Sequence, residues 1–117
     1  PGEVHTVSTG AGGMALVREA PGEKAVSIFG GMGMVASEGD HVAIEGPRDA
    51  SGLVEVTFEP GTVSGETRGK SRTIVIGSAG IKKGAATIDG VSINADRHGS
   101  DGVRFSAPEG KRRFRVE

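Results

Sequence analysis

The chain has 117 residues, of which 14 are lysine or arginine and 15 are aspartate or glutamate, so its formal net charge is −1. With 35% hydrophobic and 25% charged residues, the composition excludes a disordered chain, which combines low hydrophobicity with high net charge. The charge balance, together with only four phenylalanines and no tyrosine or tryptophan, argues against a nucleic-acid binder, which needs basic and stacking side chains.

Cysteine is absent, which excludes disulfides, thiolate metal sites and cysteine nucleophiles. No apolar run approaches the roughly 20 residues of a membrane helix, so we expect a soluble protein without a membrane partner. The start at Pro1 does not resemble a signal peptide. We expect one β domain over residues 1–117, which is either a whole protein or a processed piece of a larger one.

Glycine is the most informative residue type, with 21 in the chain, well above the roughly 7% of average usage. Glycine weakens helices but supplies the positive φ angles of tight turns. Its even spread between short apolar stretches predicts many strands joined by turns. Residues 14–20 are the best helical stretch, and Pro21 ends it after about two turns, so we expect little or no helix.

The predicted strands follow from alternating apolar and polar side chains. In chain order they are residues 4–8, 15–18, 25–29, 32–36, 41–45, 53–59, 73–76, 85–88, 91–93, 103–105 and 113–117. Residues 53–59 show the clearest alternation, which is typical of a strand with one face in the core. Residues 73–76 have no such alternation and predict a central strand buried on both faces. Residues 64–72 form the longest polar loop.

Two turns carry specific predictions. Asp89-Gly90 lies between two short strands and predicts a type I′ hairpin, which needs positive φ at both residues. The segment 108–110 predicts a hairpin that pairs the last two strands. Strands at about 8–12-residue spacing predict an all-β fold: a single antiparallel β-sandwich, or a jelly-roll or barrel-like domain, of about 8–11 short strands.

Two glycine-rich segments match the phosphate-binding string G-x-G-x-x-A, at residues 10–15 and 31–36. Neither leaves room for the long crossover helix that this motif requires, so we interpret both as turns. Residues 30–35 also offer an apolar contact segment for self-association, although methionine there is also a common core filler.

Catalytic patterns are weak. Ser78 follows a buried strand, and Asp40-His41 offers an oriented base, but Ile76 stands where a nucleophile elbow needs glycine. We therefore interpret Ser78 as a turn residue. The three histidines, His5, His41 and His98, lack the spacing of a zinc site. A small enzyme that uses Pro1 or a histidine is the least favoured function, and a non-catalytic role is preferred.

A calcium loop is the one metal site that the sequence suggests. Asn94 and Asp96 occupy the first and third positions of such a loop, a glycine occupies the sixth, and Asp101 could add an oxygen ligand. The twelfth position, where a bidentate glutamate belongs, is Phe105. An exposed turn explains the same residues, so calcium is the only cofactor considered and otherwise none is expected.

The sharpest charge cluster lies at the C-terminus. If residues 113–117 form a strand, Arg113 and Arg115 point outward together, and Lys111 and Arg104 can join them in a cationic patch. Such a patch fits the charge spacing of an acidic polysaccharide. The alternative is an edge strand that charge protects from aggregation.

The same region carries a resemblance. The segment 101–117, with a polar turn, Val103-Arg104-Phe105, Ala107-Pro108-Glu109-Gly110 and a basic-aromatic strand, resembles the closing hairpin of β-sandwich accessory domains in secreted bacterial polysaccharide-degrading enzymes, polysaccharide lyases among them. The resemblance implies a non-catalytic module with no catalytic residues to assign. Because tryptophan and tyrosine are absent, sugar stacking is lacking and a packing or stabilising role is favoured.

These observations leave ranked functions. The first is a non-catalytic β-sandwich module of an extracellular or cell-surface carbohydrate-active protein, which stabilises an adjoining catalytic domain or binds an anionic polysaccharide. The second is a self-assembling structural protein of a virion or a surface layer, which would be a homo-oligomer.

Overall fold

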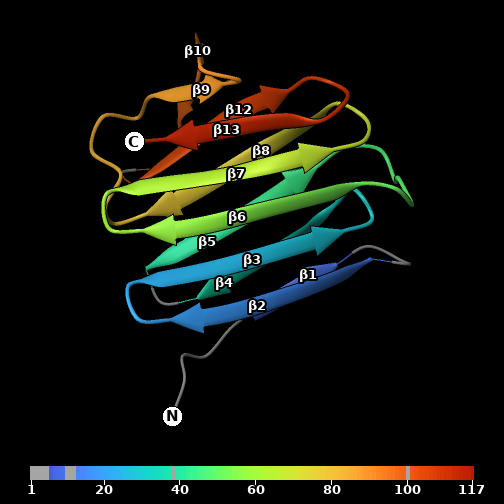
Figure 1. Ribbon diagram of the computed structural model, residues 1–117, viewed down its shortest axis with the longest axis horizontal. Helices are drawn as coiled ribbons and strands as arrows, with labels where there is room; N and C mark the ends of the chain where they lie inside the picture. Colours follow the sequence, from blue (N-terminus) through green and yellow to red (C-terminus); the bar gives the residue numbers. More distant parts are fainter. Residues whose placement is uncertain (1–5, 10–12, 38, 100) are drawn as a thin grey trace.

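The computed structural model describes residues 6–9, 13–37, 39–99 and 101–117 (Figure 1). These residues form thirteen β-strands and no helix, and therefore no helix of the length and apolarity that a membrane crossing needs. The strands are β1 Thr6–Thr9, β2 Met14–Ala20, β3 Glu23–Phe29, β4 Gly33–Ser37, β5 Asp40–Glu45, β6 Leu53–Glu59, β7 Thr62–Arg68, β8 Arg72–Ser78, β9 Ala86–Ile88, β10 Val91–Ile93, β11 Asp96–Arg97, β12 Gly102–Ala107 and β13 Arg112–Val116.

The strands form two antiparallel sheets that pack on each other, as Figure 1 shows. The six-stranded sheet has the order β1-β4-β5-β8-β12-β11, and the seven-stranded sheet has the order β10-β9-β13-β7-β6-β3-β2. Neither sheet closes into a barrel. The predicted all-β antiparallel fold without helix is thus confirmed, and the two packed sheets form a β-sandwich and not a closed barrel. The thirteen strands exceed the predicted number of about 8–11.

The core lies between the sheets and takes aliphatic side chains from both. Strand β8 lies in the middle of its sheet, between β5 and β12. Its Ile74 and Ile76 face the core, and Val75 on the opposite face is only 4% exposed, so the prediction of a strand buried on both faces is confirmed. Phe105 of β12 and Phe114 of β13 meet across the core with ring centroids 5.5 Å apart.

The predicted pairing of the last two strands is wrong. Strand β12 pairs with β8 and β11, whereas β13 pairs with β7 and β9 in the other sheet. The segment 108–110 therefore crosses from one sheet to the other. The physical reason is burial: Phe105 and Phe114 both reach the core, and they do so from opposite sides. Strand β13 is also an interior strand, so its interpretation as a protected edge is wrong.

The hairpin at Asp89-Gly90 is confirmed. Ile88 of β9 lies opposite Val91 of β10, and Asp89 and Gly90 have φ angles of 51° and 80°. Both central residues thus adopt the positive φ that a type I′ turn requires. The Asp89 carboxylate also accepts a hydrogen bond of 3.0 Å from the backbone N–H of Arg113, which ties the hairpin to β13.

Part of the predicted polar loop is a strand. Residues 64–72 include most of β7, which lies in the middle of the seven-stranded sheet between β13 and β6. Its inward side chains are few: Val63 and Thr67 are buried, and Gly65 lies between them. A side chain at residue 65 would not fit, because the ring of Phe114 and the carbonyl oxygen of Glu55 occupy the space where a Cβ would lie. Neighbouring strands supply the packing that its own sequence lacks.

Candidate anion-binding surface

Strands β7 and β13 place basic side chains on the outer face of the seven-stranded sheet. In their antiparallel register Arg113 lies opposite Glu66 and Arg115 lies opposite Ser64. Opposite residues in an antiparallel pair project from the same face of the sheet, and this face points away from the core. The side chain of Arg113 is 81% exposed.

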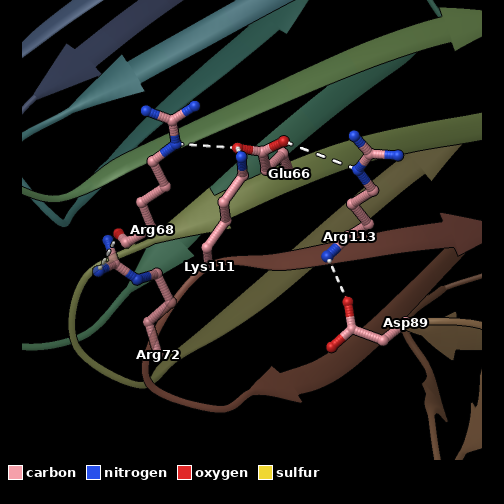
Figure 2. A network of polar contacts seen from close by, with 6 residues as sticks. All are labelled: Glu66, Arg68, Arg72, Asp89, Lys111 and Arg113. Carbon is pink, nitrogen blue, oxygen red and sulfur yellow. Dashed lines mark hydrogen bonds and ion pairs between the residues drawn. The ribbon is translucent and has the colours of Figure 1, made fainter.

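One carboxylate, that of Glu66, is contacted by the cations of Arg68, Lys111 and Arg113 (Figure 2). Among the described residues, Glu66 is contacted by Arg68 Nε at 2.8 Å, by Lys111 Nζ at 3.8 Å and by Arg113 Nε at 3.9 Å. The hydrogen bond from Arg68 lowers the pKa of Glu66, and the charges of Lys111, Arg68 and Arg113 lower it further. Glu66 is therefore ionised at neutral pH, and the four residues, called here the Glu66 cluster, carry an excess of two positive charges.

The cluster is open to solvent, which sets the strength of its contacts. The side chains of Arg68, Lys111 and Arg113 are all more than half exposed. Exposed ion pairs contribute only about 0–1 kcal/mol each, because water and salt screen them. An incoming anion can therefore replace Glu66 as the partner of a cation at little cost.

Arg115 extends the basic surface along β13. Its Nε donates to Glu117 at 2.8 Å, and this hydrogen bond lowers the pKa of Glu117. A shallow groove of about 330 Å³ crosses β6, β7 and β13, and its lining includes Glu66 and Arg113 of the cluster together with Glu55, which is opposite Glu66 in the register.

The structure does not bring Arg104 into this surface. Arg104 lies on β12 in the other sheet, where its Nη2 is 3.7 Å from Glu45. The predicted four-residue patch is corrected for this reason: the chain crosses between the sheets after β12. Arg68 takes the place of Arg104, and sequence reasoning missed it because it fell in a predicted loop. The period-two placing of Glu66 and Arg68 along β7 was the available signal.

Among the described residues, those of the predicted calcium loop belong to no cluster of acidic and histidine side chains that could hold a metal ion. Asn94 is exposed between β10 and β11, and Asp96 lies opposite Arg104 across the β11–β12 pair. Asp101 precedes β12, and its backbone oxygen accepts a hydrogen bond of 2.9 Å from the N–H of Ser78. Within the described ranges no three histidine, aspartate or glutamate side chains are placed to hold a metal ion. Calcium stays a prediction from sequence.

The catalytic candidates form a structural link. Ser78 Oγ donates a hydrogen bond of 2.7 Å to Asp40, and the other oxygen of Asp40 accepts one of 3.0 Å from the buried Lys24. Lys24 comes from the opposite sheet, so this contact joins the two layers. Ser78 is thus bonded to a carboxylate that is already engaged, which does not activate it as a nucleophile.

Two histidines, His41 and His98, lie at the outer face of the six-stranded sheet. His41 and His98 line a groove of about 450 Å³ with Asp101. The His41 ring occupies the space where Gly77 lacks a side chain. Its pKa is lowered, first by burial and then by the charge of His98, while Asp40 acts in the opposite direction. Pro1, His5 and residues 10–12 of the first glycine-rich segment lie outside the described residues.

A comparison of the chain with models of known protein families, with curated proteins and with solved structures finds no match. The class that the structure defines is an antiparallel β-sandwich with a basic cluster on the outer face of its larger sheet.

Proposed function

We propose that this chain is a non-catalytic β-sandwich module that binds an anionic polysaccharide through the Glu66 cluster and Arg115. The observation that carries the proposal is the sharing of one carboxylate by three exposed cations. An exposed excess of positive charge on a protein whose net charge is −1 is a local feature of this face.

The spacing of the cations supports a polymeric ligand. Arg113 and Arg115 are two residues apart on one strand, which places their Cα atoms roughly 6.5–7 Å apart. Arg68 stands on the adjacent strand β7, two residues after Glu66, and contacts the carboxylate oxygen that Arg113 does not. Guanidinium groups donate two parallel hydrogen bonds to a carboxylate or sulfate, so a row of them suits a chain of repeating acidic sugars.

The nature of the surface also predicts how binding behaves. Because the chain has no tryptophan or tyrosine to stack on a sugar ring, affinity would come from charge and fall as salt rises. In this proposal the protein works outside the cell beside a catalytic domain that acts on the polysaccharide. This setting follows from the resemblance of the C-terminal segment to accessory domains.

The experiment is a calorimetric titration with heparin and with alginate at two salt concentrations. We expect binding that weakens with salt, and a loss of about 5-fold in affinity for each of Lys111→Ser and Arg113→Ser, which corresponds to about 1 kcal/mol per contact. Arg104→Ser is the matched control, because it removes an exposed arginine of the opposite sheet. Its affinity should equal that of the native chain.

The substitution Glu66→Gln should change the polyanion affinity in the opposite direction. Removing the shared carboxylate frees three cations, so polyanion affinity should increase. Absence of binding at low salt, or equal losses from Arg113→Ser and Arg104→Ser, would overturn the proposal.

A further inference from the structure

Strand β2 forms one edge of the seven-stranded sheet and is the longest strand at any edge. It has seven residues, whereas the edge strands β1, β10 and β11 have four, three and two. In Figure 1 it lies with β1 at the end of the sandwich opposite β10. Within the described ranges no strand pairs with its outer side. A long edge strand presents a row of unpaired backbone donors and acceptors.

The register with β3 shows which backbone groups point outward. Ala20 and Glu23 close the two-residue turn as a directly opposite pair, and such a closing pair exchanges both backbone hydrogen bonds. Alternate residues therefore bond to β3, beginning with Ala20. The N–H and C=O groups of Ala15 and Val17 point to the open edge of β2, which is the side away from β3.

The side chains of β2 do not protect this edge. Met14 is 54% exposed and Leu16 is 52% exposed on the outer face of the sheet. Protected edges carry proline, a bulge or charged residues along their length. The register of β2 runs without a bulge from Met14 to Ala20, and its charged residues are confined to Arg18 and Glu19 near the turn.

We propose that the open edge of β2 pairs with β2 of a second copy of this chain, antiparallel about a two-fold axis at Leu16. In this register Leu16 lies against Leu16 of the second copy, and Ala15 lies opposite Val17 of that copy. The outward N–H and C=O groups of Ala15 and Val17 then bond across the interface. The two seven-stranded sheets become one continuous sheet.

Charge and side-chain type favour this occupant and this register. Met14 lies opposite Arg18 of the second copy, so no like charges face each other, and the two exposed leucines cover one another. Moving the axis to Val17 would instead place each Leu16 against an arginine. The self-complementary sequence of β2 is what points to a second copy rather than a different protein. The residues of the Glu66 cluster take no part in this interface.

The absence of native cysteine gives a direct test of the register. Residues directly opposite in a non-hydrogen-bonded pair have Cα atoms about 4.5 Å apart, within the range of a disulfide. Mild oxidation of Leu16→Cys should therefore give a covalent dimer rapidly. Val91→Cys is the matched control, since Val91 is 65% exposed on β10 at the far edge of the same sheet. Equal rates of crosslinking in the two variants would overturn the proposed interface.

Sedimentation of the unmodified chain tests the association itself. We expect a concentration-dependent dimer at tens of micromolar, weakened at least 10-fold by Leu16→Lys and unchanged by Val91→Lys. Both positions are exposed, so neither lysine should prevent folding. A chain that is monomeric at 100 micromolar would overturn the proposal and leave the edge to a strand of another protein. So would a dimer that Leu16→Lys does not weaken.

Discussion

The carboxylate of Asp49 lies 3.6 Å from Nη2 of Arg72, and both side chains are buried. Asp49 also accepts hydrogen bonds from the backbone N–H of Lys70 at 2.9 Å and from the hydroxyl of Ser51 at 2.8 Å. Arg72 Nε donates to the carbonyl oxygen of Lys70 at 2.9 Å. The pair thus ties the connection between β5 and β6 to the connection between β7 and β8, and so links the two sheets at one end of the sandwich.

Removing the acid of this pair should be costly. Asp49→Ala leaves a buried guanidinium without its counter-charge, and we expect the free energy of unfolding to fall by about 3–5 kcal/mol. Urea unfolding followed by circular dichroism measures the change. Glu45→Gln is the control, because it removes the partner of Arg104 in an exposed ion pair and should cost less than about 1 kcal/mol. Equal losses in the two variants would show that the buried pair contributes no more to the free energy of unfolding than the exposed pair does.

Asp49 also predicts how stability depends on acid. Hydrogen bonds from the Lys70 backbone and the Ser51 hydroxyl lower its pKa from 3.8 to about 2. Since the unfolded chain binds the proton more readily, this stabilisation is complete above about pH 4 and is lost as the pH falls through 2. Unfolding free energies measured at pH steps from 5 to 2 should decline less steeply in Asp49→Asn than in the native chain. Parallel curves would contradict this assignment.

The packing of His41 against Gly77 predicts a change in a titration. Burial is the main cause of the lowered pKa of His41, and a Cβ on residue 77 would overlap its ring. In Gly77→Ala the ring should turn toward solvent, and the pKa of His41 should rise toward 6.5, as followed by proton NMR. His98→Asn removes only the second cause and should produce a smaller rise. A larger rise in His98→Asn would contradict burial as the main cause.

His41 also makes the stability of the fold depend on pH below neutrality. Its pKa in the folded protein is lower than 6.5, so the unfolded chain takes up the proton first and stability decreases as the pH falls below about 6.5. Unfolding measurements between pH 7.5 and 5 should show this decrease in the native chain. The dependence should be weaker in Gly77→Ala.

The close approach at Gly65 predicts a sensitive position in the core. Gly65→Ala would drive a methyl group into the carbonyl oxygen of Glu55 and the ring of Phe114. Because backbone cannot yield as a flexible side chain can, we expect a loss of at least about 3 kcal/mol in the free energy of unfolding. Ser64→Ala changes the adjacent outward position and should stay within about 0.5 kcal/mol. Thermal unfolding of the two variants provides the comparison.

The sequence was a good guide to local structure and a poor guide to pairing. Strand β6 was identified by the alternation in residues 53–59, and β8 by the apolar run at residues 73–76. Both patterns lie within a single strand, because burial on one face or on both faces determines which of its residues are apolar. The turn at Asp89-Gly90 was equally clear, because positive φ is a property of those residues. Strand β7 was missed, since neighbouring strands supply most of its stabilisation.

By itself the sequence determined that this protein is an all-β chain of short strands and that Arg113 and Arg115 project together from one strand. Only the tertiary structure decided their neighbours. Arg104 is close to Arg113 along the chain but lies on the opposite sheet, whereas the distant Arg68 shares Glu66 with it. Side-chain alternation is a property of each strand's own sequence. Which sheet a strand joins depends on how all the strands together enclose one core.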